Sequence, residues 1–144
     1  MDAQSYATHR RLVPLYHYVL TGLMLVLTVG AVVDLYRAWR RASGRLEAAV
    51  LLGLVVAAWL LLYFVRIFAL KAQDRAIRAE ETIRHFALTG KLPDARLRVR
   101  QYVALRFASD AELPALARRA AEEGLSNDAI KRAVTGWRAD HYRV

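Results

Sequence analysis

The sequence contains no cysteine, and this absence excludes several kinds of chemistry. Disulfide bridges, thiolate nucleophiles and Cys-based zinc or iron–sulfur sites all need a thiol, which the 144 residues do not supply. Histidine is scarce as well, and no two of the four are three or four residues apart: His9, His17, His85 and His141. The sequence therefore predicts no metal ion and no cofactor.

Catalytic motifs are also absent from the sequence. No glycine-rich phosphate loop, HExxH or GxSxG appears in it. We therefore assign no catalytic residue and predict that the protein is not an enzyme.

Acidic residues are fewer than basic ones, and charge of either sign is confined to parts of the chain. The sequence has 13 Asp and Glu against 22 Lys and Arg, a formal net charge of +9, although 56% of its residues are hydrophobic. Uncharged residues run from 12 to 33 and again from 48 to 65. This separation of apolar and charged segments predicts a membrane protein.

Two apolar runs are long enough to cross a bilayer as helices. The first, LVPLYHYVLTGLMLVLTVGAVV, has 22 residues, and at about 1.5 Å per residue it spans a hydrocarbon core of about 30 Å. The second, AAVLLGLVVAAWLLLYFV, has 18 residues and continues past Arg66, whose guanidinium can reach the lipid headgroups. We predict spans at about residues 12–35 and 46–70. A cleaved signal peptide is the alternative for the first run, but the run is too long and DLYRAWRRASG is a poor cleavage site.

The connection between the spans, RAWRRASGR, is short, so the helices form an antiparallel hairpin with both termini on one side of the membrane. The positive-inside rule compares the basic residues at the two ends. Seven lie on the side of the termini and four in the connection: Arg10, Arg11, Arg66, Lys71, Arg75, Arg78 and Arg84 against Arg37, Arg40, Arg41 and Arg45. The count favours cytoplasmic termini.

Small residues repeat every four positions in the second span, at Ala49, Gly53 and Ala57. Such a stripe lets another helix approach closely. Two interpretations stay open: the stripe packs within the hairpin, or it is a docking face for another membrane protein.

Polar side chains in or beside the spans offer a second class of function. Asp34 precedes Arg37 by three residues, which predicts a local ion pair. His17 is expected at the membrane interface, and the alternative is a haem or chlorophyll ligand in a larger complex. A membrane enzyme or transporter would need Asp34, Arg66 or His17 in one polar cavity. Asp34 and Arg66 lie at opposite ends of an antiparallel hairpin, which argues against a single site.

Residues 71–144 are predicted to form an extramembrane basic helical domain. No helix breaker separates the second span from KAQDRAIRAEETIRHFALTGKLP, so the span continues as one long helix until Gly90 and Pro93. RLRVRQYVALRF fits both strand and helix periods, and we choose helix because no partner strand exists. Two amphipathic helices follow, AELPALARRAAEEG and SNDAIKRAVTGWRADHY. The predicted fold is all-α: a transmembrane hairpin, a long second helix and a small helical C-terminal cap.

The stretch ALRFASDAEL presents two carboxylates beside a serine. Ser109 and Glu112 match a capping box, in which each residue's side chain accepts a hydrogen bond from the other's backbone. Pro114 fits this badly, because it would be the fifth helical residue, beyond the first turn that tolerates proline. Ser126 is predicted to cap the last helix.

The domain after the spans carries 15 Lys or Arg and 10 Asp or Glu, a surplus of +5. Its densest basic stretch supplies the predicted lipid headgroup contacts Arg96, Arg98 and Arg100. We do not expect nucleic acid as a partner, since no binding motif accompanies the charge.

Four segments carry a resemblance to a known family: QSYATHRRLVPLYHYVL, RIFALKAQDRAIRAEETIRHFALTGK, ALRFASDAELPAL and LSNDAIKRAVTGWRADHYRV. The sequence resembles DUF6526, a family of small bacterial membrane proteins of unknown function, along essentially the whole chain. The resemblance implies a two-span hairpin, a helical tail and a bacterial inner membrane. It implies no functional residues.

We therefore expect a non-catalytic membrane interaction or scaffold protein. Its expected partners are lipids and either another membrane protein or further copies of itself. The alternatives are an accessory or assembly subunit of a respiratory or photosynthetic complex and, from another class, a small membrane enzyme or transporter component.

Overall fold

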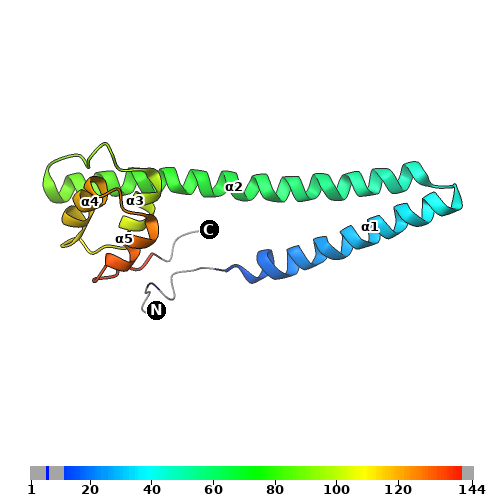
Figure 1. Ribbon diagram of the computed structural model, residues 1–144, viewed down its shortest axis with the longest axis horizontal. Coiled ribbons are helices and arrows are strands. Elements are labelled where there is room, and N and C mark those ends of the chain that lie inside the picture. The colour runs from blue at the N-terminus through cyan, green and yellow to red at the C-terminus, as the bar shows by residue number, and fades with distance from the viewer. Residues whose placement is uncertain (1–5, 7–11, 141–144) are drawn as a thin grey trace. The chain divides into compact units, whose positions relative to one another are not determined.

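The computed structural model describes residue 6 and residues 12–140, and the described part is all helical (Figure 1). Its elements are a π-helix η1 (Leu15–Leu20), α1 (Thr21–Arg41), α2 (Arg45–Thr89), α3 (Val99–Leu105), α4 (Leu113–Glu122) and α5 (Asn127–Ala133). No strand occurs in this described part, which confirms the all-α prediction and the long second helix. Arg10 and Arg11 lie outside the described residues.

The chain divides into two compact units, and α2 contributes to both. Phe68 is the last residue of the hairpin unit, and Ala69 begins the second unit, which we call the cap and to which Tyr6 also belongs. The boundary falls two residues before the predicted one.

The hairpin unit consists of η1, α1 and the first part of α2. The turn between α1 and α2 uses left-handed backbone at Ala42 (φ 54°) and Gly44 (φ 72°). Met24, Ala31 and Val55 are buried between the helices. Both helices are long and apolar enough to cross a membrane.

A hydrogen bond between side chains also joins the two hairpin helices. Trp59 Nε1 donates to Thr28 Oγ1 at 3.0 Å, and Thr28 Oγ1 donates in turn to the Met24 carbonyl at 2.6 Å. The indole N–H thus has a partner within an otherwise apolar segment, where an unpaired polar group would be costly.

The structure corrects one interpretation of the small-residue stripe. Ala49, Gly53 and Ala57 are all exposed, so they do not pack within the hairpin. The face of α2 that meets α1 contains Leu52 and Val55 instead. Leu52 and Val55 thus belong to one apolar cluster with Ala31 of α1, and the stripe lies outside this cluster.

The cap unit consists of the second part of α2 and the three short helices. α2 stops where predicted, since Gly90 follows it with a left-handed φ of 69°. The prediction of helix in RLRVRQYVALRF is confirmed over Val99–Leu105. Residues from all three short helices form the core: Leu97, Tyr102, Ala104, Leu105, Ala108, Leu113, Leu116, Ala117, Ala120, Ala121, Ile130 and Val134.

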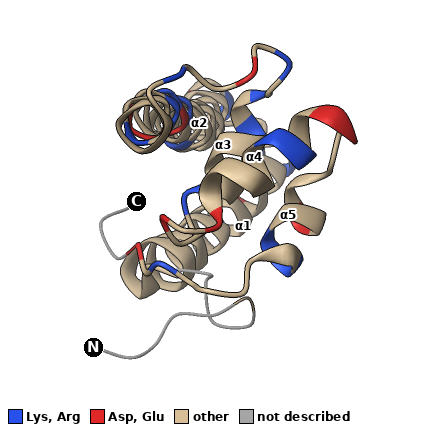
Figure 2. Ribbon diagram, turned by 90° about the vertical axis from the view of Figure 1, so that its left-hand side faces the viewer, with Lys and Arg blue, Asp and Glu red and all other residues tan. Residues whose placement is uncertain are grey.

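The last helix is shorter than the sequence suggests. Ser126 is its N-cap, and Ser126 Oγ accepts from the Ala129 amide at 3.1 Å. The helix ends at Ala133, and Val134 is extended. Following residues leave the helix because their amides bond elsewhere: Thr135 and Gly136 donate to the Glu112 carboxylate. Figure 2 shows charged residues on the ribbons of both α4 and α5.

Candidate functional site

The densest set of specific contacts in the cap surrounds the segment ALRFASDAEL, residues 104–113. Phe107 is fully buried, and its ring lies 4.9 Å from the Trp137 ring, centroid to centroid. The Phe107 carbonyl accepts from the Arg138 amide at 2.8 Å. A contact between aromatic rings and a backbone hydrogen bond therefore both join the segment to the chain after α5.

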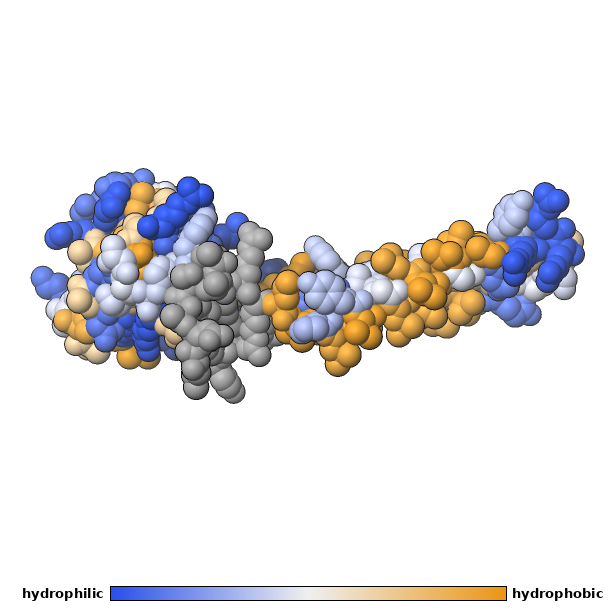
Figure 3. All heavy atoms as spheres, turned by 90° about the horizontal axis from the view of Figure 1, so that it is seen from below, coloured by the Kyte–Doolittle hydropathy of each residue, from blue (hydrophilic) through white to orange (hydrophobic). Residues whose placement is uncertain are grey.

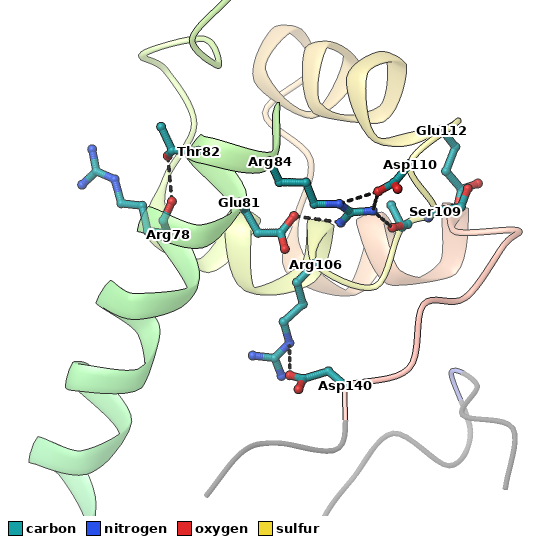
Figure 4. Close-up of polar contacts among 10 residues, drawn as sticks. Arg78, Glu81, Thr82, Arg84, Arg106, Ser109, Asp110, Glu112 and Asp140 are labelled. Atoms are coloured by element: carbon teal, nitrogen blue, oxygen red, sulfur yellow. Dashed lines mark hydrogen bonds and ion pairs between the residues drawn. The ribbon is translucent and has the colours of Figure 1, made fainter. Parts of the chain in front are cut away.

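Arg84 of α2 binds three acceptors, and two of them belong to this segment (Figure 4). Its guanidinium donates to Glu81 Oε2 at 2.9 Å, to Asp110 Oδ1 at 2.7 Å and to the Ala108 carbonyl at 2.7 Å. Only 12% of the Arg84 side chain is exposed. Arg84 thus links α2 to the ALRFASDAEL segment with a largely buried charge.

Glu81 is the most buried carboxylate of this cluster. It is 6% exposed, and burial raises its pKa above the usual value although the Arg84 charge and hydrogen bond act to lower it. An open depression of about 310 Å³ lies beside it, lined by Glu80, Glu81, Arg84, Asp110 and Arg138. The depression is polar, and two of its acids, Glu81 and Asp110, are held by ion pairs with Arg84.

A second ion pair joins the same segment to the C-terminal part of the described chain. Arg106 Nε lies 3.2 Å from Asp140 Oδ2, and the Arg106 guanidinium carbon lies 4.6 Å from the centre of the Phe107 ring. Arg106 is 9% exposed. This arginine is therefore a packing group of the cap.

The predicted capping box is only half present. The Glu112 carboxylate accepts from the Ser109 amide at 3.0 Å, but helix α4 begins at Leu113 with Glu112 as its N-cap, not Ser109. Pro114 consequently lies in the first turn, where the backbone N–H groups have no partner within the helix and proline therefore removes no helical hydrogen bond. The sequence mismatch noted at Pro114 was the signal of this later start.

Glu112 instead connects α4 to the chain after α5. Its carboxylate accepts from Thr135 Oγ1 at 2.7 Å and from the Thr135 and Gly136 amides at 3.2 Å each. Burial raises its pKa, but these bonds and the one from Ser109 lower it more, so the net pKa lies below the usual value.

Glu112 should make the cap sensitive to acid. Because its pKa is lowered on folding, its stabilisation is complete above the unfolded pKa and is lost as the pH falls through the folded pKa. Urea unfolding of the full chain in detergent micelles, repeated between neutral pH and about pH 3, should show this loss. Glu112→Gln should be less stable at neutral pH and should lose less stability in acid; an equally steep loss in this variant would contradict the assignment.

Gln101 is a buried polar residue that sequence reasoning missed. Its Nε2 donates to the Ala120 carbonyl at 2.9 Å and to the Leu125 carbonyl at 3.0 Å, while its Oε1 accepts from the Arg98 amide at 2.8 Å. The basic residues around this glutamine predict that it is exposed. Only its position in a helical row of apolar residues indicates that it is buried. One side chain thereby joins the start of α3 to the end of α4.

Gln101→Leu should destabilise the cap by about 1–3 kcal/mol, because the shape is nearly kept while buried backbone groups lose their partners. Amide hydrogen exchange of the full chain should show faster exchange in α3 and α4 and unchanged exchange in the hairpin. Unchanged protection of α3 would show that these hydrogen bonds contribute nothing.

The predicted lipid contacts differ in their surroundings. Arg96 is bound by Asp94, with Nη2 2.7 Å from Oδ2, and this pairing lowers the pKa of Asp94 to about 2. Arg98 and Arg100 are exposed, and neither side chain makes an ion pair with a described residue. Of the three arginines, Arg98 and Arg100 are therefore the ones whose charge is not paired with a carboxylate of the described residues.

Arg66 and His17 both contact the Tyr16 ring, whereas Asp34 pairs with neither of them. The Arg66 guanidinium carbon lies 5.8 Å from the centre of the Tyr16 ring, and His17 packs edge-on against Tyr16 at 5.2 Å. His17 Nδ1 is 3.0 Å from the Val13 carbonyl. Asp34 is exposed and makes no ion pair within the described chain, so the predicted pair with Arg37 does not form.

Two of the segments that carry the family resemblance therefore meet in space. ALRFASDAEL contacts the WRAD residues, 137–140, through Phe107 and Arg106. It contacts the preceding Thr135 and Gly136 through Glu112. A family model described as "Family of unknown function (DUF6526)" matches residues 1–144. The chain belongs to this family. Searches of curated proteins and of solved structures gave no match.

The contacts of this DUF6526 protein explain what these two segments do physically. Each charged group of ALRFASDAEL bonds to another part of the cap, and the described residues contain no group of three or more His, Asp or Glu able to hold a metal ion. We call the contacts of Arg84, Arg106, Phe107 and Glu112 the clasp, because together they fix α2, α4 and the chain after α5 to one another.

Proposed function

We propose that the chain is a non-catalytic integral membrane protein whose hairpin anchors a basic helical cap that interacts with lipids and proteins. One observation carries the proposal. In each of the two candidate spans, only 11% of the apolar window is buried inside the structure. Two apolar helices cannot cover each other, so lipid is the medium that suits this surface.

The distribution of surface residues supports the anchor. Figure 3 shows apolar residues along the hairpin and hydrophilic residues at its turn. The outward side chains include Leu23, Val26, Val29, Leu54 and Leu61, all more than half exposed. This apolar surface ends at the turn, where Arg40, Arg41 and Arg45 are exposed. The count of basic residues favours cytoplasmic termini, and the family resemblance implies that the membrane is a bacterial inner membrane.

Extraction of membranes at alkaline pH tests the anchor. Membranes containing the full chain should retain it after alkaline carbonate treatment, because about 20 apolar residues per span hold it in the hydrocarbon core. A quadruple variant with Asp at Val26, Val29, Leu54 and Leu61 should be released. Release of the unchanged protein would overturn the proposal.

Anionic lipid is the proposed ligand of Arg98 and Arg100, since each basic residue near such a surface contributes about 1 kcal/mol. Amide exchange at the start of α3 should slow when nanodiscs holding the full chain contain phosphatidylglycerol instead of phosphatidylcholine alone. Replacing both arginines by Gln should reduce this slowing about tenfold or more. Arg96→Gln is the matched control, because Asp94 already neutralises Arg96, and an equal effect of the control would contradict the assignment.

A second candidate is an accessory or assembly subunit of a larger respiratory or photosynthetic membrane complex. The outward position of Ala49, Gly53 and Ala57 favours it, because small residues facing lipid allow another helix to approach. Purification in mild detergent should then recover partner subunits, and these should be lost when Gly53 is replaced by Leu.

A further inference from the structure

One face of the second part of α2 carries an apolar stripe that the cap does not cover. The stripe consists of Ala72, Ala76, Ala79, Ile83 and Phe86, all exposed. Ile83 is 69% exposed and Phe86 52% exposed. The opposite face of the same helix carries Ile77 and Glu81, each 6% exposed and turned toward the short helices. Large apolar side chains on a helix that already has one packed face indicate a second partner.

The spacing of the stripe identifies the kind of partner. Its members are separated by four, three, four and three residues, which is the a/d pattern of a coiled coil. Ala76 and Ile83 occupy a positions, and Ala72, Ala79 and Phe86 occupy d positions. Small residues permit close approach of two helices, and Ile83 and Phe86 supply knobs at the end of the seam that precedes Gly90.

The flanking charges favour a parallel copy of the same chain. Arg75 is at a g position and Glu80 at the following e position; both are exposed, and neither makes an ion pair with a described residue. In a parallel homodimer a g residue faces the next e residue of the other helix, so Arg75 meets Glu80 of the second copy, twice by symmetry. In an antiparallel pair g residues face g residues and e residues face e residues, so Arg75 and Glu80 would not meet.

We propose that the chain forms a parallel homodimer through this stripe of α2. The proposal rests on the membrane anchor, which holds two copies in the same orientation and raises their effective concentration. The seam is about two heptads long, which is marginal for helices free in water, so association depends on the anchor.

Disulfide trapping tests the seam directly, because the native chain has no cysteine. Single cysteines at Ala79 and Ile83 in proteoliposomes should form disulfide-linked dimers at least about tenfold faster than Leu88→Cys under mild oxidation. Leu88 is the matched control, an exposed apolar residue of the same helix at an f position. Equal rates at all three positions, or no dimers at any, would overturn the proposal.

Charge exchange tests the parallel register. Arg75→Glu alone or Glu80→Arg alone should slow trapping at Ala79→Cys by about fivefold, since each creates like-charge pairs, and the double exchange should restore the rate. A double variant that stays as slow as the single ones would contradict the parallel homodimer and favour another protein on this face. Alkaline extraction of the same variants separates the proposals: retained protein without dimers refutes the dimer alone, whereas released protein refutes the anchor.

Discussion

Replacing Phe107 by alanine is expected to destabilise the cap by about 3–5 kcal/mol, the largest effect of any single substitution considered. The ring is fully buried and stacks against Trp137, and the side chain of Arg106 lies across it. Removing the ring leaves a cavity and separates the ALRFASDAEL segment from the chain after α5. Hydrogen exchange of the full chain should show collapse of protection in α3, α4 and α5.

Phe107→Leu is the matched control, because it keeps much of the apolar volume and should cost about half as much or less. Protection in the hairpin should be unchanged in both variants if the hairpin folds as a separate unit. A Phe107→Ala variant with a cap as well protected as the native one would contradict the clasp.

Replacing Arg84 by methionine is expected to cost about 3 kcal/mol, since it leaves Glu81 buried without its counterion. Glu81 is already disfavoured in its charged form, as its raised pKa shows. Arg84→Met should raise that pKa further and strip a donor from the Ala108 carbonyl. Urea unfolding of the full chain in micelles should show the loss at neutral pH.

A double variant separates the buried charge from the lost packing. Adding Glu81→Gln to Arg84→Met should recover part of the stability, because the uncompensated carboxylate is gone. Asp110→Asn, by contrast, should cost well under about 1 kcal/mol, because Asp110 is 68% exposed. A double variant less stable than Arg84→Met would show that Glu81 is stabilising in its own right.

The parts of the fold that follow from local sequence could be predicted. The apolar runs, the continuation of the second helix and its end before Gly90 depend on composition and on residues adjacent in the chain. The later start of α4 was also indicated locally, since Pro114 is tolerated only in the first turn of a helix.

The contacts of the clasp could not be predicted in the same way. Arg84 and Asp110 are 26 residues apart, and neither differs in type from the exposed charges around it. Which face of a helix becomes buried depends on the surface that packs against it. For this reason the sequence could not show that Ala49 is exposed while its neighbour Ala48 is buried. The end of α5 likewise depends on Glu112, which binds Thr135 from a distant part of the chain.

The central claim is that the hairpin crosses a membrane and leaves the cap on one side, and single-cysteine labelling tests it most directly. Ser43 lies in the turn and Ala115 lies exposed on α4. In intact spheroplasts, a membrane-impermeant maleimide should label Ser43→Cys at once and Ala115→Cys only after lysis, while Val26→Cys should resist labelling in both. Equal labelling of Ser43→Cys and Ala115→Cys in intact spheroplasts, or ready labelling of Val26→Cys, would contradict the account.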